Sequence, residues 1–199
     1  AEGCNNRCSY CAIPLIRGPY RSRPYEEIMA EAKDLVKQGV RELIVVAQDT
    51  TKYGVDLYGK YKLADLLRDL NALPELKWIR VLYCYPDSFT DDLIKAFAEC
   101  EKVCKYVDLP LQHASNSLLK TMRRFDTRED AEQLLAKLRK AIPNLCVRST
   151  FIVGFPGETK EQFEELKDFI TKAKFNCAGV FTYSQEEGTE AGIMPNQIP

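Results

Sequence analysis

Three cysteines on one short stretch near the start of the chain, Cys4, Cys8 and Cys11, are the residues best suited to chemistry. They lie four and then three positions apart, and an aromatic residue, Tyr10, directly precedes the last of them. Cysteine thiolates are the usual ligands of iron–sulfur clusters. Three thiolates bind three irons of a [4Fe–4S] cube and leave the fourth iron open to a small ligand. This stretch therefore predicts a cluster at which a reaction takes place.

The residues alone leave two other uses of these cysteines open. A structural zinc site requires a fourth Cys or His at a comparably short spacing, and the next candidates, Cys84 and His113, are remote in the sequence. A disulfide framework is typical of small secreted domains, whereas this chain has 199 residues and many ordinary core residues. Both alternatives are weaker than the iron–sulfur cluster.

The composition indicates a soluble globular protein with one sizeable core. Hydrophobic residues make up 45% of the chain and charged residues 29%, and the net charge is -1. This balance gives no electrostatic sign of nucleic-acid binding, and no apolar run is long enough to span a membrane. The remaining cysteines follow no regular spacing. Their apolar neighbours predict small buried side chains in a reducing cytoplasm, at Cys84, Cys100, Cys104, Cys146 and Cys177.

Strand-like and helix-like patterns alternate along the whole chain. Continuous apolar runs rich in β-branched residues predict strands covered on both faces, and apolar residues at helical spacing between suitable caps predict helices. The predicted strands are 41–47, 78–83, 106–109, 146–153 and 178–183. The predicted helices start near Pro24, Leu63, Thr90, Ser117, Ala131 and Thr159. Such an alternation indicates right-handed βαβ units and a parallel sheet, either an open doubly wound sheet or a barrel.

Both ends of the chain indicate a fragment of a longer protein. Ala1 comes immediately before the cysteine stretch, so we expect a further strand ahead of it. Residues 194–199 resemble a linker because they combine two prolines with polar residues.

Polar residues follow the predicted strands at the edge where a parallel α/β sheet binds its ligands. The predicted strand 41–47 is followed by Gln48 and Asp49, the start of a polar run that suits either a solvated loop or a binding loop. The predicted strand 106–109 is followed by Gln112, whose amide both donates and accepts, and by His113, the only histidine. A structural role is favoured over a catalytic one for His113. Arg148 lies on an otherwise apolar strand and suits a ligand carboxylate or a neighbouring acid equally well.

Several motifs together resemble the radical S-adenosylmethionine (SAM) methylthiotransferases. They are the cysteine stretch, Arg17-Gly18 with Arg21-Ser22-Arg23, the run Leu-Gln-His-Ala-Ser from residue 111 and the run Val-Gly-Phe-Pro-Gly-Glu-Thr from residue 153. The resemblance covers essentially all 199 residues. It implies an α/β fold with a parallel sheet, the partial (β/α)6 TIM-like barrel of the radical SAM type.

The resemblance also implies cofactors and their contacts. Cys4, Cys8 and Cys11 are expected to hold a [4Fe–4S] cluster that cleaves SAM to methionine and a 5'-deoxyadenosyl radical, with no catalytic residue beyond these ligands. Tyr10 and the turn at Gly154 and Gly157 are expected to contact the adenine of SAM. Gln48 and Asp49 are expected to contact its amino group, and Arg148 its carboxylate. Gln112 is a further expected contact with the cofactor.

A further expectation concerns the substrate and the missing domains. The stretch Gln48-Asp49-Thr50-Thr51-Lys52-Tyr53-Gly54 resembles the branch that modifies the β-carbon of an aspartate in a small-subunit ribosomal protein; a tRNA-modifying enzyme is the alternative. Residues 1–199 are then the radical SAM core alone. The N-terminal methylthiotransferase domain, which carries a second [4Fe–4S] cluster, and the C-terminal TRAM domain are expected to be absent. Any contact with nucleic acid would be made through the TRAM domain. A cytoplasmic enzyme with a flavodoxin- or ferredoxin-like electron donor and no membrane contact is expected.

Overall fold

Five parallel strands lie in chain order in the computed structural model, which describes residues 1–198. They are β1 (Glu42–Val45), β2 (Trp78–Val81), β3 (Tyr106–Gln112), β4 (Cys146–Val153) and β5 (Cys177–Thr182). β1 pairs with β2, and β4 lies between β3 and β5. A parallel bridge from Ile79 to Val103, and a hydrogen bond from the Cys84 N–H to the Asp108 carbonyl, join the two groups of strands.

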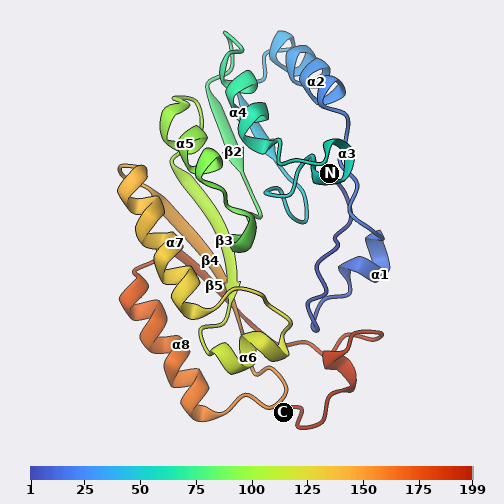
Figure 1. The fold of residues 1–199 in the computed structure, drawn as a ribbon, viewed down its shortest axis with the longest axis vertical. Coiled ribbons are helices and arrows are strands. Elements are labelled where there is room, and N and C mark those ends of the chain that lie inside the picture. Colours follow the sequence, from blue (N-terminus) through green and yellow to red (C-terminus); the bar gives the residue numbers. More distant parts are fainter. Residues whose placement is uncertain (199) are drawn as a thin grey trace.

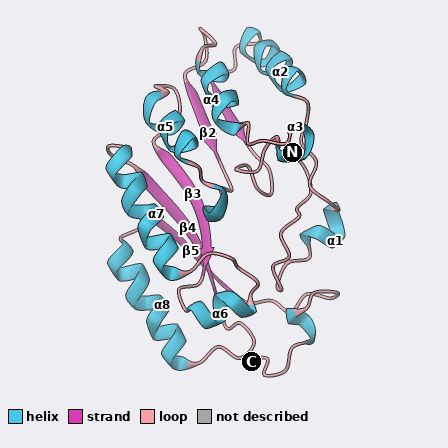
Figure 2. Ribbon diagram, in the orientation of Figure 1, coloured by secondary structure: helices cyan, strands magenta, loops and turns pink. Residues whose placement is uncertain are grey.

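Helices connect the strands and cover one side of them (Figures 1 and 2). They are α1 (Ile13–Arg17), α2 (Tyr25–Lys37), α3 (Val55–Tyr58), α4 (Leu63–Asn71), α5 (Asp91–Glu99), α6 (Asn116–Thr121), α7 (Arg128–Ala141) and α8 (Lys160–Ala173), with short 3-10 turns η1 (Pro86–Ser88) and η2 (Ala191–Ile193). Strands that follow chain order distinguish a β/α barrel from a doubly wound sheet, whose strand order reverses. The fold is therefore the predicted partial barrel, open between β1 and β5 in the part of the chain that the structure describes.

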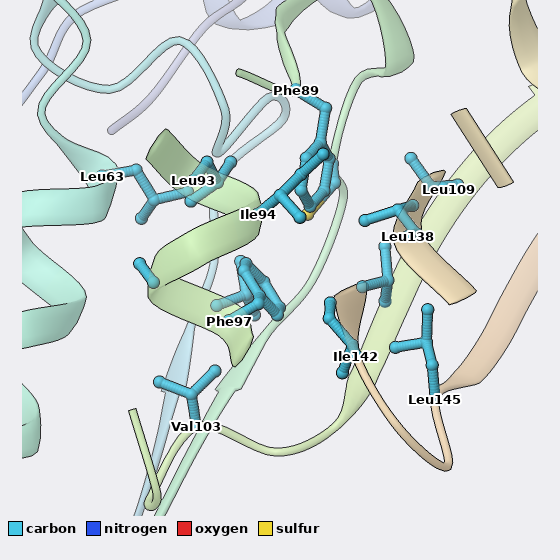
Figure 3. Close-up of a cluster of buried hydrophobic side chains, with 14 of the residues drawn as sticks. Leu63, Phe89, Leu93, Ile94, Phe97, Val103, Leu109, Leu138, Ile142 and Leu145 are labelled. Atoms are coloured by element: carbon cyan, nitrogen blue, oxygen red, sulfur yellow. The ribbon is translucent and has the colours of Figure 1, made fainter. Parts of the chain in front are cut away.

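The hydrophobic core lies between the strands and the covering helices. Figure 3 shows Phe97 from α5 and Leu138 from α7 directed toward Leu109 of β3, and all three side chains are buried. Phe151 of β4 contacts the ring of Phe169 from α8 edge-on. Burying such side chains stabilises the fold by roughly 1.5–3 kcal/mol each relative to leaving them in water. This packing fixes the helices and so leaves the strand ends in defined positions.

Side-chain caps begin three of the helices, two of them at the residues that the sequence predicts. Thr90 accepts a hydrogen bond from the Leu93 N–H at the start of α5. Thr159 and Gln162 form a capping box at α8. Thr127 forms another with Asp130 at α7, which therefore begins earlier than predicted.

Two predictions about exposed segments are wrong. Cys177 is exposed rather than buried, because β5 pairs only with β4 among the described residues and no helix covers it. Residues 194–197 do not form a free linker: the Asn196 carbonyl accepts a hydrogen bond from the Gly157 N–H, and the Gln197 amide donates to Ala191 and Met194. Pro199 lies outside the described residues.

The strand ends that face the inner side of the barrel carry unusual backbone conformations. Tyr83, just after β2, and Gln112, at the end of β3, have φ angles of 56° and 70° in the left-handed region, which non-glycine residues rarely adopt. Such strain costs on the order of 1–3 kcal/mol per residue and is found mostly at functional sites. Both residues border the cavity described below. Among the described residues, no helix has the length and apolar character needed to cross a membrane.

Candidate active site

The cysteine loop, residues 3–11, is held by backbone contacts to two distant segments. The Cys4 N–H donates to the Gly18 carbonyl at 3.2 Å, and the Ser9 N–H to the Met122 carbonyl at 3.0 Å. Gly3 is required here, since a Cβ atom at this position would overlap the Pro19 carbonyl oxygen and the residue has a φ of +73°. The loop therefore has a defined shape although it contains neither helix nor strand.

A buried polar network fixes the loop to the end of β1. Asp49, whose side chain is 1% exposed, accepts hydrogen bonds from the Asn6 amide and from the Thr51 hydroxyl. The Lys52 ammonium donates to the Asn6 side-chain oxygen at 2.6 Å and lies 3.6 Å from the Asp49 carboxylate. Buried charges persist when they are paired and hydrogen-bonded in this way. Asp49 thus holds the loop over the barrel.

All three cysteines of the loop line one cavity of about 310 Å³ at the carboxyl ends of the strands. Burial raises the pKa of the Cys4 and Cys11 thiols. The described residues hold no group of three His, Cys, Asp or Glu side chains close enough to bind a single metal ion. Each thiolate of a cubane cluster binds a different iron, so this spacing suits a cluster better than one zinc ion. Three thiols with no fourth protein ligand, facing a cavity, fit a cluster with one open iron.

Four of the seven residues predicted to contact SAM line this cavity, namely Tyr10, Gln48, Gln112 and Arg148. Tyr10 comes from the cysteine loop and Gln48 from the segment after β1. Gln112 ends β3, and Arg148 lies in the first half of β4. The remaining lining contains tyrosines, apolar groups and a further arginine: Asn6, Ile13, Tyr83, Cys84, Tyr85, Pro110, Arg124, Thr150 and Phe181. This mixture of apolar surface and a few polar groups is typical of small-molecule sites.

The other three predicted SAM contacts do not border the cavity. Asp49 lies beneath the cysteine loop in the network described above. At the glycine turn, the N–H groups of Gly154 and Phe155 donate to the Glu158 carboxylate. The Gly157 N–H donates to the Asn196 carbonyl. These residues shape the surroundings of the cavity, and their backbone donors have partners within the chain.

Arg148 is held by an acid from the neighbouring strand. Its Nη1 lies 2.7 Å from Oδ1 of Asp108, whose side chain is 2% exposed and whose Oδ2 accepts a hydrogen bond from the Tyr83 N–H. Of the two expectations for Arg148, the ion pair with an acid is the one observed. The guanidinium nevertheless borders the cavity, and its further N–H donors suit a carboxylate there.

His113 serves to order the glycine turn. Its Nδ1 accepts a hydrogen bond from the Ser115 N–H at 3.0 Å, so the ring proton lies on Nε2 and is directed at Glu158, 3.2 Å away. The ring is fully buried, and burial lowers its pKa. His113 does not border the cavity. The geometry therefore agrees with the structural role that the sequence favoured.

Sequence reasoning missed two residues of the cavity, Tyr85 beside Cys8 and Arg124 behind it. The Tyr85 hydroxyl is 3.9 Å from the Cys8 sulfur, and the Arg124 guanidinium carbon is 3.9 Å from the centre of the Tyr85 ring. Tyr85 follows the predicted strand 78–83, and a position after a strand end could have identified it as a candidate site residue. Arg124 comes from the loop after α6, and nothing in its sequence context distinguishes it from the exposed Arg123 beside it.

Comparisons with known proteins agree with this site. The family model described as the Radical SAM superfamily matches residues 1–170. A ribosomal protein uS12 methylthiotransferase RimO from Desulforamulus reducens is 62% identical over 198 residues, which is 100% of this chain and 45% of that protein. The protein of the same name from Pelotomaculum thermopropionicum is 58% identical over 199 residues, again 100% of this chain and 45% of that protein. The chain therefore spans about half the length of these relatives.

Solved structures share the fold at low sequence identity. The radical SAM methyltransferase TsrM from Kitasatospora setae superposes with a TM-score of 0.76 at 22% identity, over 96% of this chain and 37% of that one. Coproporphyrinogen III oxidase (HemN) from Escherichia coli gives a TM-score of 0.72 at 14% identity, over 100% of this chain and 47% of that one. At these identities the likeness concerns the fold alone.

Proposed function

Because the chain belongs to the radical SAM superfamily, we propose that it is the catalytic core of an enzyme that methylthiolates an aspartate β-carbon in ribosomal protein uS12. The observation that carries this proposal is the convergence of Cys4, Cys8 and Cys11 on one cavity. Identity of 62% over the whole chain to a uS12 methylthiotransferase supports the substrate. A cytoplasmic location follows from a ribosomal substrate.

The cavity residues have separate tasks in this proposal. Cys4, Cys8 and Cys11 hold a [4Fe–4S] cluster, which supplies the electron that cleaves SAM. Arg148, oriented by Asp108, binds the SAM carboxylate through its remaining donors. Gln48 and Gln112 offer amide groups to the polar parts of SAM, and the Tyr10 ring lies against its adenine. Phe181 and Ile13 add apolar surface that excludes water.

Other parts of the proposed enzyme lie outside these residues. The chain matches 45% of its relatives, which supports residues 1–199 as one radical SAM core within a longer protein. In that protein an N-terminal methylthiotransferase domain holds the second cluster, and a C-terminal TRAM domain makes any nucleic-acid contact. A flavodoxin- or ferredoxin-like protein supplies electrons. The tRNA alternative is not favoured, since the relatives above are named for uS12.

Mass spectrometry of ribosomal proteins and tRNA from the source cells tests the proposal. In cells whose full-length enzyme carries Cys8→Ala, we expect uS12 to lose the mass of one methylthio group, because the cluster is lost. Cells with Cys177→Ala are the matched control, since this thiol is exposed and does not border the cavity, and their uS12 is expected to keep the group. Unchanged uS12 together with loss of a methylthio group from tRNA would show that the substrate is wrong.

A further inference from the structure

Tyr85 and Arg124, to which the proposed function gives no task, meet at the Cys8 ligand. The Tyr85 hydroxyl lies 3.9 Å from the Cys8 sulfur, a distance at which a hydroxyl still bonds to the large sulfur atom. The Arg124 guanidinium carbon lies 3.9 Å from the Tyr85 ring centre. All three residues border the cavity, and Tyr85 is 8% exposed. The Tyr85 hydroxyl therefore lies beside Cys8, and a positive charge lies behind it against the Tyr85 ring; both groups are shielded from water.

The direction of the contact between Tyr85 and Cys8 follows from the chemistry of a metal-bound cysteine. A thiolate that binds iron carries no proton, so its sulfur can only accept a hydrogen bond. The Tyr85 hydroxyl is then the donor. Its ring is held in place by Arg124 and by Lys52, whose ammonium lies 5.1 Å from the ring centre.

Arg124 is buried with part of its hydrogen-bonding capacity unused. Its side chain is 2% exposed, and Nη2 lies 3.2 Å from Asp126 and donates to the Pro110 carbonyl at 3.2 Å. Its Nε–H, also buried, has no partner among the described residues. An unused donor of a buried cation is costly unless negative charge lies near it. Asp126 supplies part of that charge, and the thiolates of the cavity add to it.

We propose that Tyr85 and Arg124 are positioning residues that raise the reduction potential of the cluster through the Cys8 ligand. Reduction adds one electron, and hence one negative charge, to the cluster and its thiolates. A hydrogen bond to Cys8 and a buried cation beside it stabilise this added charge, and hydrogen bonds to cluster sulfurs are a known determinant of potential. No bond breaks, and the phenol proton stays on Tyr85. The inference rests on the proposed function, because it requires the cluster.

A redox titration of the reconstituted protein, followed by electron paramagnetic resonance, tests the effect of Tyr85. Tyr85→Phe removes only the hydroxyl, so its midpoint potential is expected to be more negative than that of the wild type. Tyr83→Phe is the matched control: it removes a hydroxyl from the same cavity, and no contact of that hydroxyl with a cysteine is observed. Its potential is expected to equal that of the wild type. Equal potentials for Tyr85→Phe and the wild type would overturn the inference.

A second set of variants covers the arginine and any failure of Tyr85→Phe to fold. Arg124→Gln removes the charge and is expected to shift the potential to more negative values. Arg124→Lys keeps the charge, so its potential is expected to stay close to that of the wild type. Tyr85→3-fluorotyrosine makes the hydroxyl a stronger donor, so the expected shift has the opposite sign. If neither Arg124→Gln nor Tyr85→3-fluorotyrosine moves the potential, the inference is wrong. The iron content of each sample shows whether the cluster is present. A wild-type protein that holds no cluster would contradict the proposed function instead.

Discussion

Replacement of Cys4, Cys8 and Cys11 together by alanine is expected to abolish iron binding and SAM cleavage. The three sulfurs are the only protein ligands that the loop offers, and they border one cavity. The described structure has no fourth Cys, His, Asp or Glu grouped with them to replace a lost ligand. The measurement is the iron content and the visible absorbance of the protein after anaerobic reconstitution with iron and sulfide, followed by detection of 5'-deoxyadenosine.

The matched control replaces the other five cysteines, two of them buried, two half-buried and one exposed: Cys84, Cys100, Cys104, Cys146 and Cys177. Serine suits the exposed position, and alanine suits the buried ones. This variant is expected to keep the full iron content, although it loses some stability because Cys84 and Cys100 pack in the core. If iron loading survives the triple change in the loop and disappears in the control, the ligand assignment is incorrect.

Loss of the buried carboxylate at residue 49 is expected to have the next largest effect. Asp49→Ala leaves the Asn6 amide and the Thr51 hydroxyl without their acceptor, and it leaves the Lys52 ammonium without its acidic partner. A buried polar group without a partner costs about 1–3 kcal/mol, so the free energy of unfolding should fall by at least that amount. The cysteine loop loses its attachment to β1, and the iron content after reconstitution should fall as well.

Urea unfolding and iron analysis of the same preparations measure both effects. Asp34→Ala is a suitable control, because this aspartate is 68% exposed and pairs only with Lys37 on the surface of α2. Substitutions of that kind usually change stability by no more than about 0.5 kcal/mol. A stable Asp49→Ala protein with full iron content would mean that Asp49 does not hold the loop.

The strand and helix pattern could be predicted from the sequence because local signals were strong. The run Leu43 to Val46 and the caps at Thr90 and Thr159 specify their elements without help from distant residues, and the structure contains all five predicted strands. The exposure of Cys177 could not be predicted in this way. It depends on what lies beside β5 in space, which no local pattern reports.

The site was predicted to a lesser extent, for a related reason. Cysteine spacing and strand ends identify residues that reach the cavity, as Gln48 and Gln112 do. They do not tell whether a polar side chain faces a cavity or supports a neighbouring loop. The Asp49 carboxylate accepts a hydrogen bond from Asn6 of the cysteine loop and does not border the cavity. Arg124 was missed because its burial against Tyr85 results from the tertiary packing of a loop.

The most direct test of the central claim is an iron count and spectrum of the reconstituted wild-type chain, with and without SAM. The account predicts about four irons per chain, the number in one [4Fe–4S] cluster. It also predicts that the electron paramagnetic resonance signal of the reduced protein changes when SAM is added, because SAM binds at the open iron. Under reducing conditions, 5'-deoxyadenosine should form from SAM. One zinc ion per chain with no iron, or a cluster whose signal is unaffected by SAM and that leaves SAM intact, would contradict it.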